Sequence, residues 1–257
     1  MWRHIAQSLQ GPSHLGDGTP CQDTSAVRVF KEGPACALVA CVADGAGSAK
    51  FGDIGSSIAC ETIVERANSF LELNGRLDGL QSEDVLNWCE EARRRIDDES
   101  ARRECQRRDL ATTLCVAIVA PTCSFFFQIG DGAIILGRSG IYGVVFWPQS
   151  GEYANSTNFL TADDYKQRLE FHSTTSRFTD LALFTDGLER LALRFDGQTA
   201  HVPFFEPLFR ALRTAEDVEQ LSEGLRKFLT SDPVQSRSDD DKTLILATRH
   251  ALDDNAA

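Results

Sequence analysis

The sequence has no apolar run that approaches the roughly 20 residues of a membrane-spanning helix. Its first residues, MWRHIAQSLQGPSH, also lack the apolar core of a secretory signal peptide. Basic residues are few, 26 against 38 acidic ones, and the formal net charge of -12 argues against a nucleic-acid-binding surface. We therefore expect a cytoplasmic protein with no nucleic-acid and no membrane partner. The excess of carboxylates leaves a cation site open.

The eight cysteines include no C-x-x-C pair, and most of them lie within apolar runs. This favours reduced core cysteines over disulfides or a zinc site. The chain also contains no internal repeat and no low-complexity linker. We expect a single domain over residues 1–250, followed by a flexible tail over residues 251–257.

Short apolar runs rich in Val, Ile, Leu, Phe and Thr, with Gly, Asp or Pro between them, predict strands. Many follow one another after short turns, which indicates mainly antiparallel sheets. Apolar residues at three- to five-residue spacing predict a helix over 54–71, another around 85–96 and a helical pair over 205–231. The order of elements is typical of an α+β fold with helices covering sheet faces. The expected strands cover 3–9, 25–30, 35–43, 111–120, 124–130, 133–138, 140–147, 181–185 and 242–249.

Asp-Gly occurs six times, and three of these pairs follow an apolar run: Asp44-Gly45, Asp131-Gly132 and Asp186-Gly187. A fourth acidic group, 239–241, precedes the run KTLILATR. Carboxylates that meet repel one another and shift their pKa values unless a cation neutralises them. Oxygen ligands without His or Cys select Mg²⁺ or Mn²⁺ over zinc. The residues alone therefore support a carboxylate site for a hard cation.

Each acidic group also has a simpler explanation. Asp131-Gly132 between two apolar runs is a short-range signal for a two-residue hairpin. Asp186 could be the N-cap of a helix, and the triple aspartate could be a solvated turn. At this point both explanations stay open.

The order of the motifs resembles the metal-dependent type 2C serine/threonine protein phosphatases, especially their compact bacterial members. Six stretches between residues 13 and 247 carry the resemblance: SHLGDGTPCQDTSAV, VADGAGSAKFGD, ATTLCVAIV, QIGDGAIILGR, LALFTDGLERL and SDDDKTLILA. It implies a four-layer α-β-β-α sandwich of two antiparallel sheets flanked by helices. It also implies two Mn²⁺ or Mg²⁺ ions at one end of the sandwich, and an attack on phosphorus by a water that these ions activate, without a protein nucleophile.

The resemblance also assigns roles to single residues. Asp23 looks like a ligand of one ion, Asp44 like the bridging ligand, and the carbonyl of Gly45 like a further ligand. Asp186 and Asp240 look like the carboxylates of the other ion. In many bacterial members the residue similar to Asp131 helps to hold a third, more labile ion. Asp239 and Asp241 remain alternatives to Asp240, because a one-residue shift of the alignment would exchange their roles.

Two positions depart from the family pattern. Many members carry a phosphate-binding arginine at the position of Gly18, five residues before Asp23. Better-studied members carry a histidine, a candidate general acid, at the position of Ala46. His14 is the nearest polar group that could bind phosphate in place of the arginine, and His14 or Ser48 could take part in proton transfer. His14 could equally be a turn or surface histidine.

The leading hypothesis is a monomeric phosphatase of phosphoserine and phosphothreonine in proteins that opposes a serine/threonine kinase. The alternative is a module of the same fold that binds a phosphoprotein without cleaving it, which the missing arginine and histidine motivate. A third hypothesis treats the aspartates as turn residues only. The polar segment 148–180 is a candidate for substrate selection.

Overall fold

Two five-stranded sheets form the centre of the protein, and every strand pair in them is antiparallel. The computed structural model describes residues 2–30, 37–150 and 157–249. Sheet I has the order β1 (Trp2–Leu9), β12 (Lys242–Arg249), β9 (Asp180–Phe184), β6 (Ala133–Arg138) and β7 (Ile141–Val144). Sheet II has the order β2 (Asp23–Phe30), β3 (Ala37–Asp44), β4 (Leu114–Val119), β5 (Ser124–Ile129) and β8 (Glu170–Thr174).

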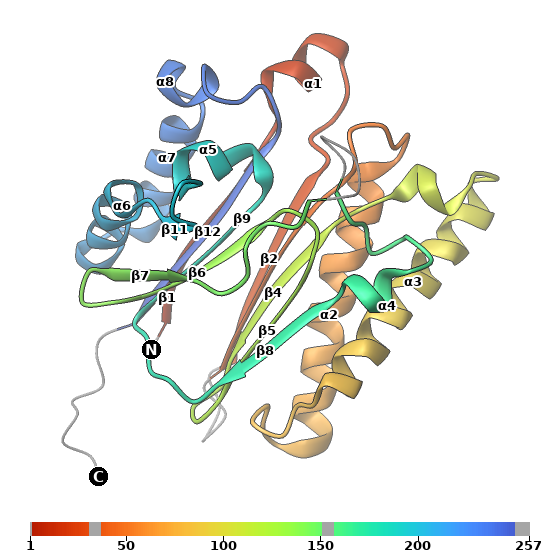
Figure 1. The fold of residues 1–257 in the computed structure, drawn as a ribbon, viewed down its shortest axis with the longest axis horizontal. Coiled ribbons are helices and arrows are strands. Elements are labelled where there is room, and N and C mark those ends of the chain that lie inside the picture. The colour runs from red at the N-terminus through yellow and green to blue at the C-terminus, as the bar shows by residue number, and fades with distance from the viewer. Residues whose placement is uncertain (1, 31–36, 151–156, 250–257) are drawn as a thin grey trace.

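Long helices cover the outer face of each sheet (Figure 1). α2 (Gly52–Asn74) and α3 (Ser82–Arg102) pack on sheet II, and α6 (Val202–Thr214) and α7 (Val218–Leu229) pack on sheet I. A third apolar cluster fills the space between the sheets. The predicted four-layer α-β-β-α fold is therefore confirmed.

Strand β3 shows why a continuous apolar run forms a strand here. Leu38, Ala40 and Val42 face the layer between the sheets, whereas Val39 and Cys41 face the helices. A strand buried on both faces needs apolar residues at every position. The run ends at Asp44, the last residue of the strand.

The helices predicted at 54–71 and around 85–96 are present with longer bounds. The pair predicted over 205–231 is also present, but it begins at Val202 and ends at Leu229. The expected strand over 140–147 ends at Val144. A short helix was considered only directly after Asp186, where η3 (Asp186–Leu188) and α5 (Glu189–Ala192) lie; β8 and the remaining short elements were not predicted. The remaining short elements are α1 (Pro12–Asp17), η2 (Arg107–Leu110), α4 (Tyr165–Arg168), β10 (Leu193–Arg194), β11 (Thr199–Ala200) and α8 (Asp232–Gln235).

The hairpin interpretation of Asp131-Gly132 is wrong. β5 pairs with β4 and β8 in sheet II, whereas the next strand, β6, pairs with β7 and β9 in sheet I. Asp131 therefore lies where the chain crosses from one sheet to the other. The preceding Gly130 has a φ of +111°, a conformation that side chains other than glycine's rarely adopt.

Seven cysteines lie in the described part of the chain, and all are free thiols. Four of them are buried, which agrees with the expected role as core residues. Among the described residues, no helix is both long and apolar enough to cross a membrane. The tail predicted over 251–257 lies outside the described residues.

Candidate metal centre

Asp23 and Asp44 occupy opposite positions at one end of the β2–β3 pair. The carboxylate of Asp23 is buried, and its Oδ2 accepts a hydrogen bond from the Thr185 hydroxyl at 2.7 Å. Its Oδ1 is buried without a hydrogen-bond donor among the described residues. A buried carboxylate oxygen without a donor is costly, so this atom calls for a cationic partner.

The backbone of Asp44 is fixed by the segment that leads into β4. Its N–H donates to the Thr113 hydroxyl at 2.9 Å, and its carbonyl accepts from the Thr113 N–H at 2.8 Å and the Thr112 hydroxyl at 3.1 Å. These bonds occupy the backbone of Asp44 and leave its carboxylate to the site.

Three aspartates from different elements converge. Asp44 ends β3, Asp131 follows β5, and Asp186 begins η3 directly after β9. Each offers a carboxylate oxygen, and these oxygens all lie within 4.8 Å of one another. Asp131 Oδ1 is also buried without a donor in the described part of the chain. Asp186 is thus the first residue of η3, not its N-cap, which is Thr185.

Burial and mutual repulsion raise the pKa values of this group. Burial raises the pKa of Asp23 to about 7, although hydrogen bonds from Thr185 partly oppose the shift. Burial and the charges of Asp131 and Asp240 raise the pKa of Asp186 to about 8. Burial, with the neighbouring aspartates, also holds the pKa of Asp44 well above its usual range. A bound cation would favour the ionised carboxylates and so oppose these shifts.

The three consecutive aspartates 239–241 have different surroundings. Asp241 is buried, and its carboxylate accepts hydrogen bonds from the backbone N–H groups of Gly11 at 2.7 Å and Gln22 at 2.6 Å. Its oxygens are therefore already in use. Asp240 instead contributes to the raised pKa values of Asp44 and Asp186, which places its charge beside the cluster.

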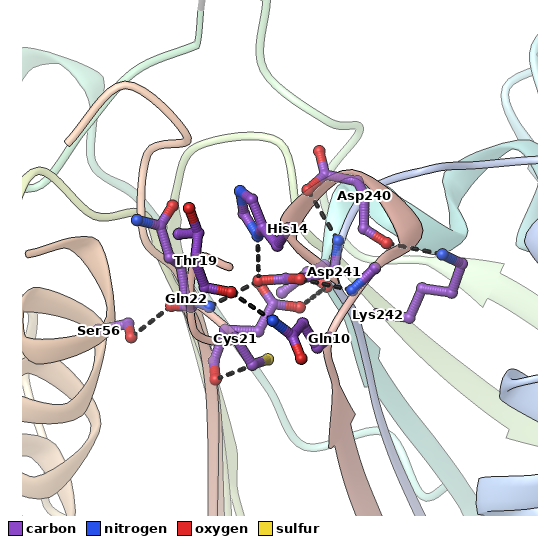
Figure 2. A network of polar contacts seen from close by, with 12 residues as sticks. Gln10, His14, Thr19, Cys21, Gln22, Ser56, Asp240, Asp241 and Lys242 are labelled. Carbon is purple, nitrogen blue, oxygen red and sulfur yellow. Dashed lines mark hydrogen bonds and ion pairs between the residues drawn. The ribbon is translucent and has the colours of Figure 1, made fainter. Parts of the chain in front are cut away.

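His14 lies in α1 against Asp241. Its Nδ1 is 2.9 Å from Asp241 Oδ2, close enough for an ion pair, although its N–H is not aligned for a hydrogen bond. Figure 2 shows the imidazole above the Asp241 carboxylate, with Asp240 and Lys242 beside it. The side chain of His14 is 12% exposed, and one of its nitrogens lies within 4.8 Å of a carboxylate oxygen of Asp240. The structure thus places His14 beside the acidic cluster and not on the open surface.

Two glycines of the Asp-Gly pairs are required by close backbone packing. A Cβ on Gly45 would lie 2.3 Å from the backbone of Gly52, and a Cβ on Gly187 would lie 1.9 Å from the carbonyl oxygen of Asp241. Gly18, where the family pattern has arginine, ends α1 with a φ of +71°. This left-handed position favours glycine and explains why no side chain stands there.

The structure therefore brings together the acids expected from the sequence. The two threonines before β4 and Thr185 were not predicted to position them. The sequence does contain a signal for these residues. Each threonine stands next to the end of an apolar run, in ATTLCVAIV or in LALFTDGL. Asp53 lies in the first turn of α2, where the helix dipole favours a negative charge.

A family model described as protein phosphatase 2C matches residues 10–230. Serine/threonine-protein phosphatase 3 of Escherichia coli (strain K12) is 37% identical over 251 residues, which are 96% of this chain and 98% of that protein. The solved structure of serine/threonine phosphatase Stp1 from Staphylococcus aureus has a TM-score of 0.65 at 15% identity and covers 97% of this chain and 96% of that one. A structure of RsbX in complex with magnesium has a TM-score of 0.57 at 18% identity, with 96% and 94% covered. At these identities the two structures support the fold.

Proposed function

The chain belongs to the protein phosphatase 2C family, and on this premise we propose that it hydrolyses phosphoserine and phosphothreonine in proteins with the help of Mn²⁺ or Mg²⁺. The observation that carries this proposal is the convergence of Asp44, Asp131 and Asp186 at the ends of three elements. Such a group of half-buried, repelling carboxylates destabilises the fold unless it serves a cation.

The residues present fit such ions. The donor set consists of oxygen atoms only, which suits Mg²⁺ or Mn²⁺. Two of the buried oxygens, on Asp23 and Asp131, have no donor among the described residues. RsbX, which has a similar fold, was solved in complex with magnesium, and this supports the proposal of a divalent cation here. We propose as ligands Asp23, Asp44, Gly45 through its carbonyl, Asp186 and Asp240, with Asp131 for a third ion.

When bound, two such cations would supply Lewis acidity toward the phosphoryl group and lower the pKa of water. The chain's own part is to hold the carboxylates in place: Thr112 and Thr113 fix the backbone of Asp44, and Thr185 orients Asp23. The small residue Ala46 leaves room beside the carboxylates for a phosphoryl group.

In this chain Gly18 and Ala46 stand where many family members have a phosphate-binding arginine and a histidine. We propose that His14 fulfils part of the role of these two residues. Its Nδ1 lies 2.9 Å from the Asp241 carboxylate, and the side chain lies beside Asp240. From there it can bind a phosphoryl oxygen or give a proton to the leaving alkoxide.

The test is hydrolysis of p-nitrophenyl phosphate and of a phosphothreonine peptide, with Mn²⁺, with Mg²⁺ and with a chelator. Turnover should need the metal, and both Asp44→Ala and Asp186→Ala should abolish it. Asp196→Ala is the matched control, because Asp196 belongs to another Asp-Gly pair and is exposed. Metal-independent turnover would refute the proposal. Binding of the phosphopeptide without phosphate release would instead support the alternative, a non-cleaving module.

We further propose that residues 1–250 act as one catalytic domain, in the cytoplasm and as a monomer. A phosphoprotein substrate implies an opposing serine/threonine kinase. Light scattering coupled to gel filtration tests the monomer, and deletion of residues 251–257 with full retention of activity would support the domain bounds.

A further inference from the structure

A pocket of about 560 Å³ opens beside the loop that follows Asp44. Three segments line it: the loop after β3, the short helix η2 and the residues after 156. Ala46 and Phe159 pack together at its apolar side with two further alanines. Its polar side includes Ser48, Arg108, Asp109 and Thr161.

The pocket lies close to the candidate metal centre. Ala46, in its wall, stands two residues after Asp44, and two residues span at most about 7 Å. The N–H of Ala46 donates to the carbonyl of Ala111 at 2.9 Å. This hydrogen bond ties the loop after β3 to the segment that fixes Asp44. An extended peptide advances about 3.3 Å per residue. A residue one to three positions from a phosphoserine bound at the candidate metal centre can therefore reach the pocket.

The wall formed by residues after 156 is held rigidly. Leu160 donates its N–H to the carbonyl of Thr112 at 2.8 Å, and the guanidinium of Arg93 donates to the carbonyls of Leu160 and Ala162. Arg93 also stacks on the ring of Tyr165, 4.2 Å from its centroid. This part of the segment expected to select substrates thus forms a fixed wall, which lowers the entropic cost of binding.

Arg108 differs from the other arginines of its stretch. Residues 93–108 contain seven arginines, and Arg93 serves the wall described above. Five others form ion pairs with acidic side chains: Arg94, Arg95, Arg102, Arg103 and Arg107. Arg108 is exposed and has no ion pair or side-chain hydrogen bond within the described ranges. The neighbouring Asp109 is engaged, because its carboxylate accepts the N–H of Gln106 at 2.9 Å.

We propose that this pocket binds an acidic side chain, Asp or Glu, of the phosphoprotein substrate close to the phosphorylated residue. Arg108 is its charged partner, because a guanidinium can grip a carboxylate with two parallel hydrogen bonds. Ser48 and Thr161 line the same pocket, and their hydroxyls can complete the contact. The inference rests on the proposed phosphatase function and adds a substrate class to it.

The experiment compares three phosphothreonine peptides that differ only at positions +1 to +3, which carry Glu, Gln or Lys. For each protein, kcat/KM on every peptide is divided by kcat/KM on p-nitrophenyl phosphate, which has no side chain to enter the pocket. The wild type should prefer the Glu peptide over the Gln peptide about tenfold, the worth of one charge-assisted contact. Arg108→Ala should lose this preference, mainly through KM, and Arg108→Glu should shift it toward the Lys peptide.

Arg210→Ala is the matched control, because Arg210 is an exposed arginine on α6, away from the pocket, and should keep the wild-type preference. A wild type that cleaves the peptides with no preference for Glu, or an Arg108→Ala variant that keeps the preference, would overturn the inference alone. If the wild type showed no metal-dependent turnover of any substrate, both the proposed function and this inference would be overturned.

Discussion

Asp23 and Asp44 face each other at the end of the β2–β3 pair, one at the start of a strand and one at the end of its neighbour. Two carboxylates opposite each other in an antiparallel pair repel, and here Asp23 is buried and Asp44 is half-buried. The pair lies at one end of the sandwich, beside Asp131 and Asp186. The metal-free protein should therefore carry an energetic cost that cation binding relieves.

The first prediction concerns Asp44→Asn. In the presence of a chelator at neutral pH, the variant should be more stable than the wild type by about 1 kcal/mol or more, or about 2–4 °C in Tm. The amide avoids both the repulsion and the cost of protonating a buried carboxylate. Differential scanning calorimetry with and without Mn²⁺ measures this, and Asp196→Asn is the control. A metal-free variant less stable than the wild type would contradict the idea of a strained acidic cluster.

The second prediction concerns pH. The pKa values of Asp23, about 7, and Asp186, about 8, lie above those of an unfolded chain. The metal-free folded state therefore keeps protons that the unfolded state has lost, and its stability should fall as pH rises from about 5 to 8. Over the same range Mn²⁺ should bind more tightly, because fewer protons compete for the oxygens. Calorimetric titration in two buffers of different ionisation enthalpy should detect proton release when Mn²⁺ binds. If no protons were released, the raised pKa values of Asp23 and Asp186 would be contradicted.

The residue pattern was sufficient to predict antiparallel sheets covered by helices and acids at the strand ends, and the family resemblance added the four-layer sandwich. Each acid interrupts or borders an apolar run, and such runs are visible without a structure. The pairing of Asp23 with Asp44 was not predictable in the same way. β3 is apolar on both faces, so no alternation of polar residues sets its register against β2.

The role of Asp241 was also beyond the sequence. Its partners Gly11 and Gln22 lie 230 and 219 residues away in the chain. The sequence alone does not show which of the three adjacent aspartates is buried. The same holds for Arg108, which local spacing cannot distinguish from its paired neighbours. Long-range packing decides both cases.

The third prediction separates Asp241 from its neighbour Asp239. Asp241→Ala leaves the N–H groups of Gly11 and Gln22 without acceptors in a buried place, at a cost of about 2 kcal/mol or more. Asp239 is exposed, so Asp239→Ala should change the free energy of unfolding by less than about 0.5 kcal/mol. Urea denaturation measures both variants. Equal stability of the two would show that Asp241 does not hold α1 and β2 in place.

The fourth prediction compares two glycines that follow aspartates. Gly187→Ala should destabilise the protein by about 1–3 kcal/mol, because its Cβ would meet the carbonyl oxygen of Asp241 at 1.9 Å. Gly197→Ala finds no atom closer than 3.8 Å and should be neutral or slightly stabilising. Thermal melts of both variants with Mn²⁺ test this. A tolerated Gly187→Ala would mean that η3 and the loop before β12 can separate freely.

The last prediction concerns His14→Gln, which keeps a polar side chain but cannot act as an acid near neutral pH. If His14 gives a proton to the leaving group, the variant should lose about 10²-fold or more in kcat on a phosphoserine peptide, whose alkoxide leaves poorly. It should lose much less on p-nitrophenyl phosphate, whose phenolate needs no such help, and the alkaline limb of its pH profile should change. If His14 only binds phosphate, both substrates should lose kcat/KM equally. His201→Gln is the control, because His201 lies at the start of α6, where its Nδ1 contacts the carbonyl of Leu191. Wild-type kinetics of His14→Gln on both substrates would exclude either role and leave His14 as a residue that only packs against Asp241.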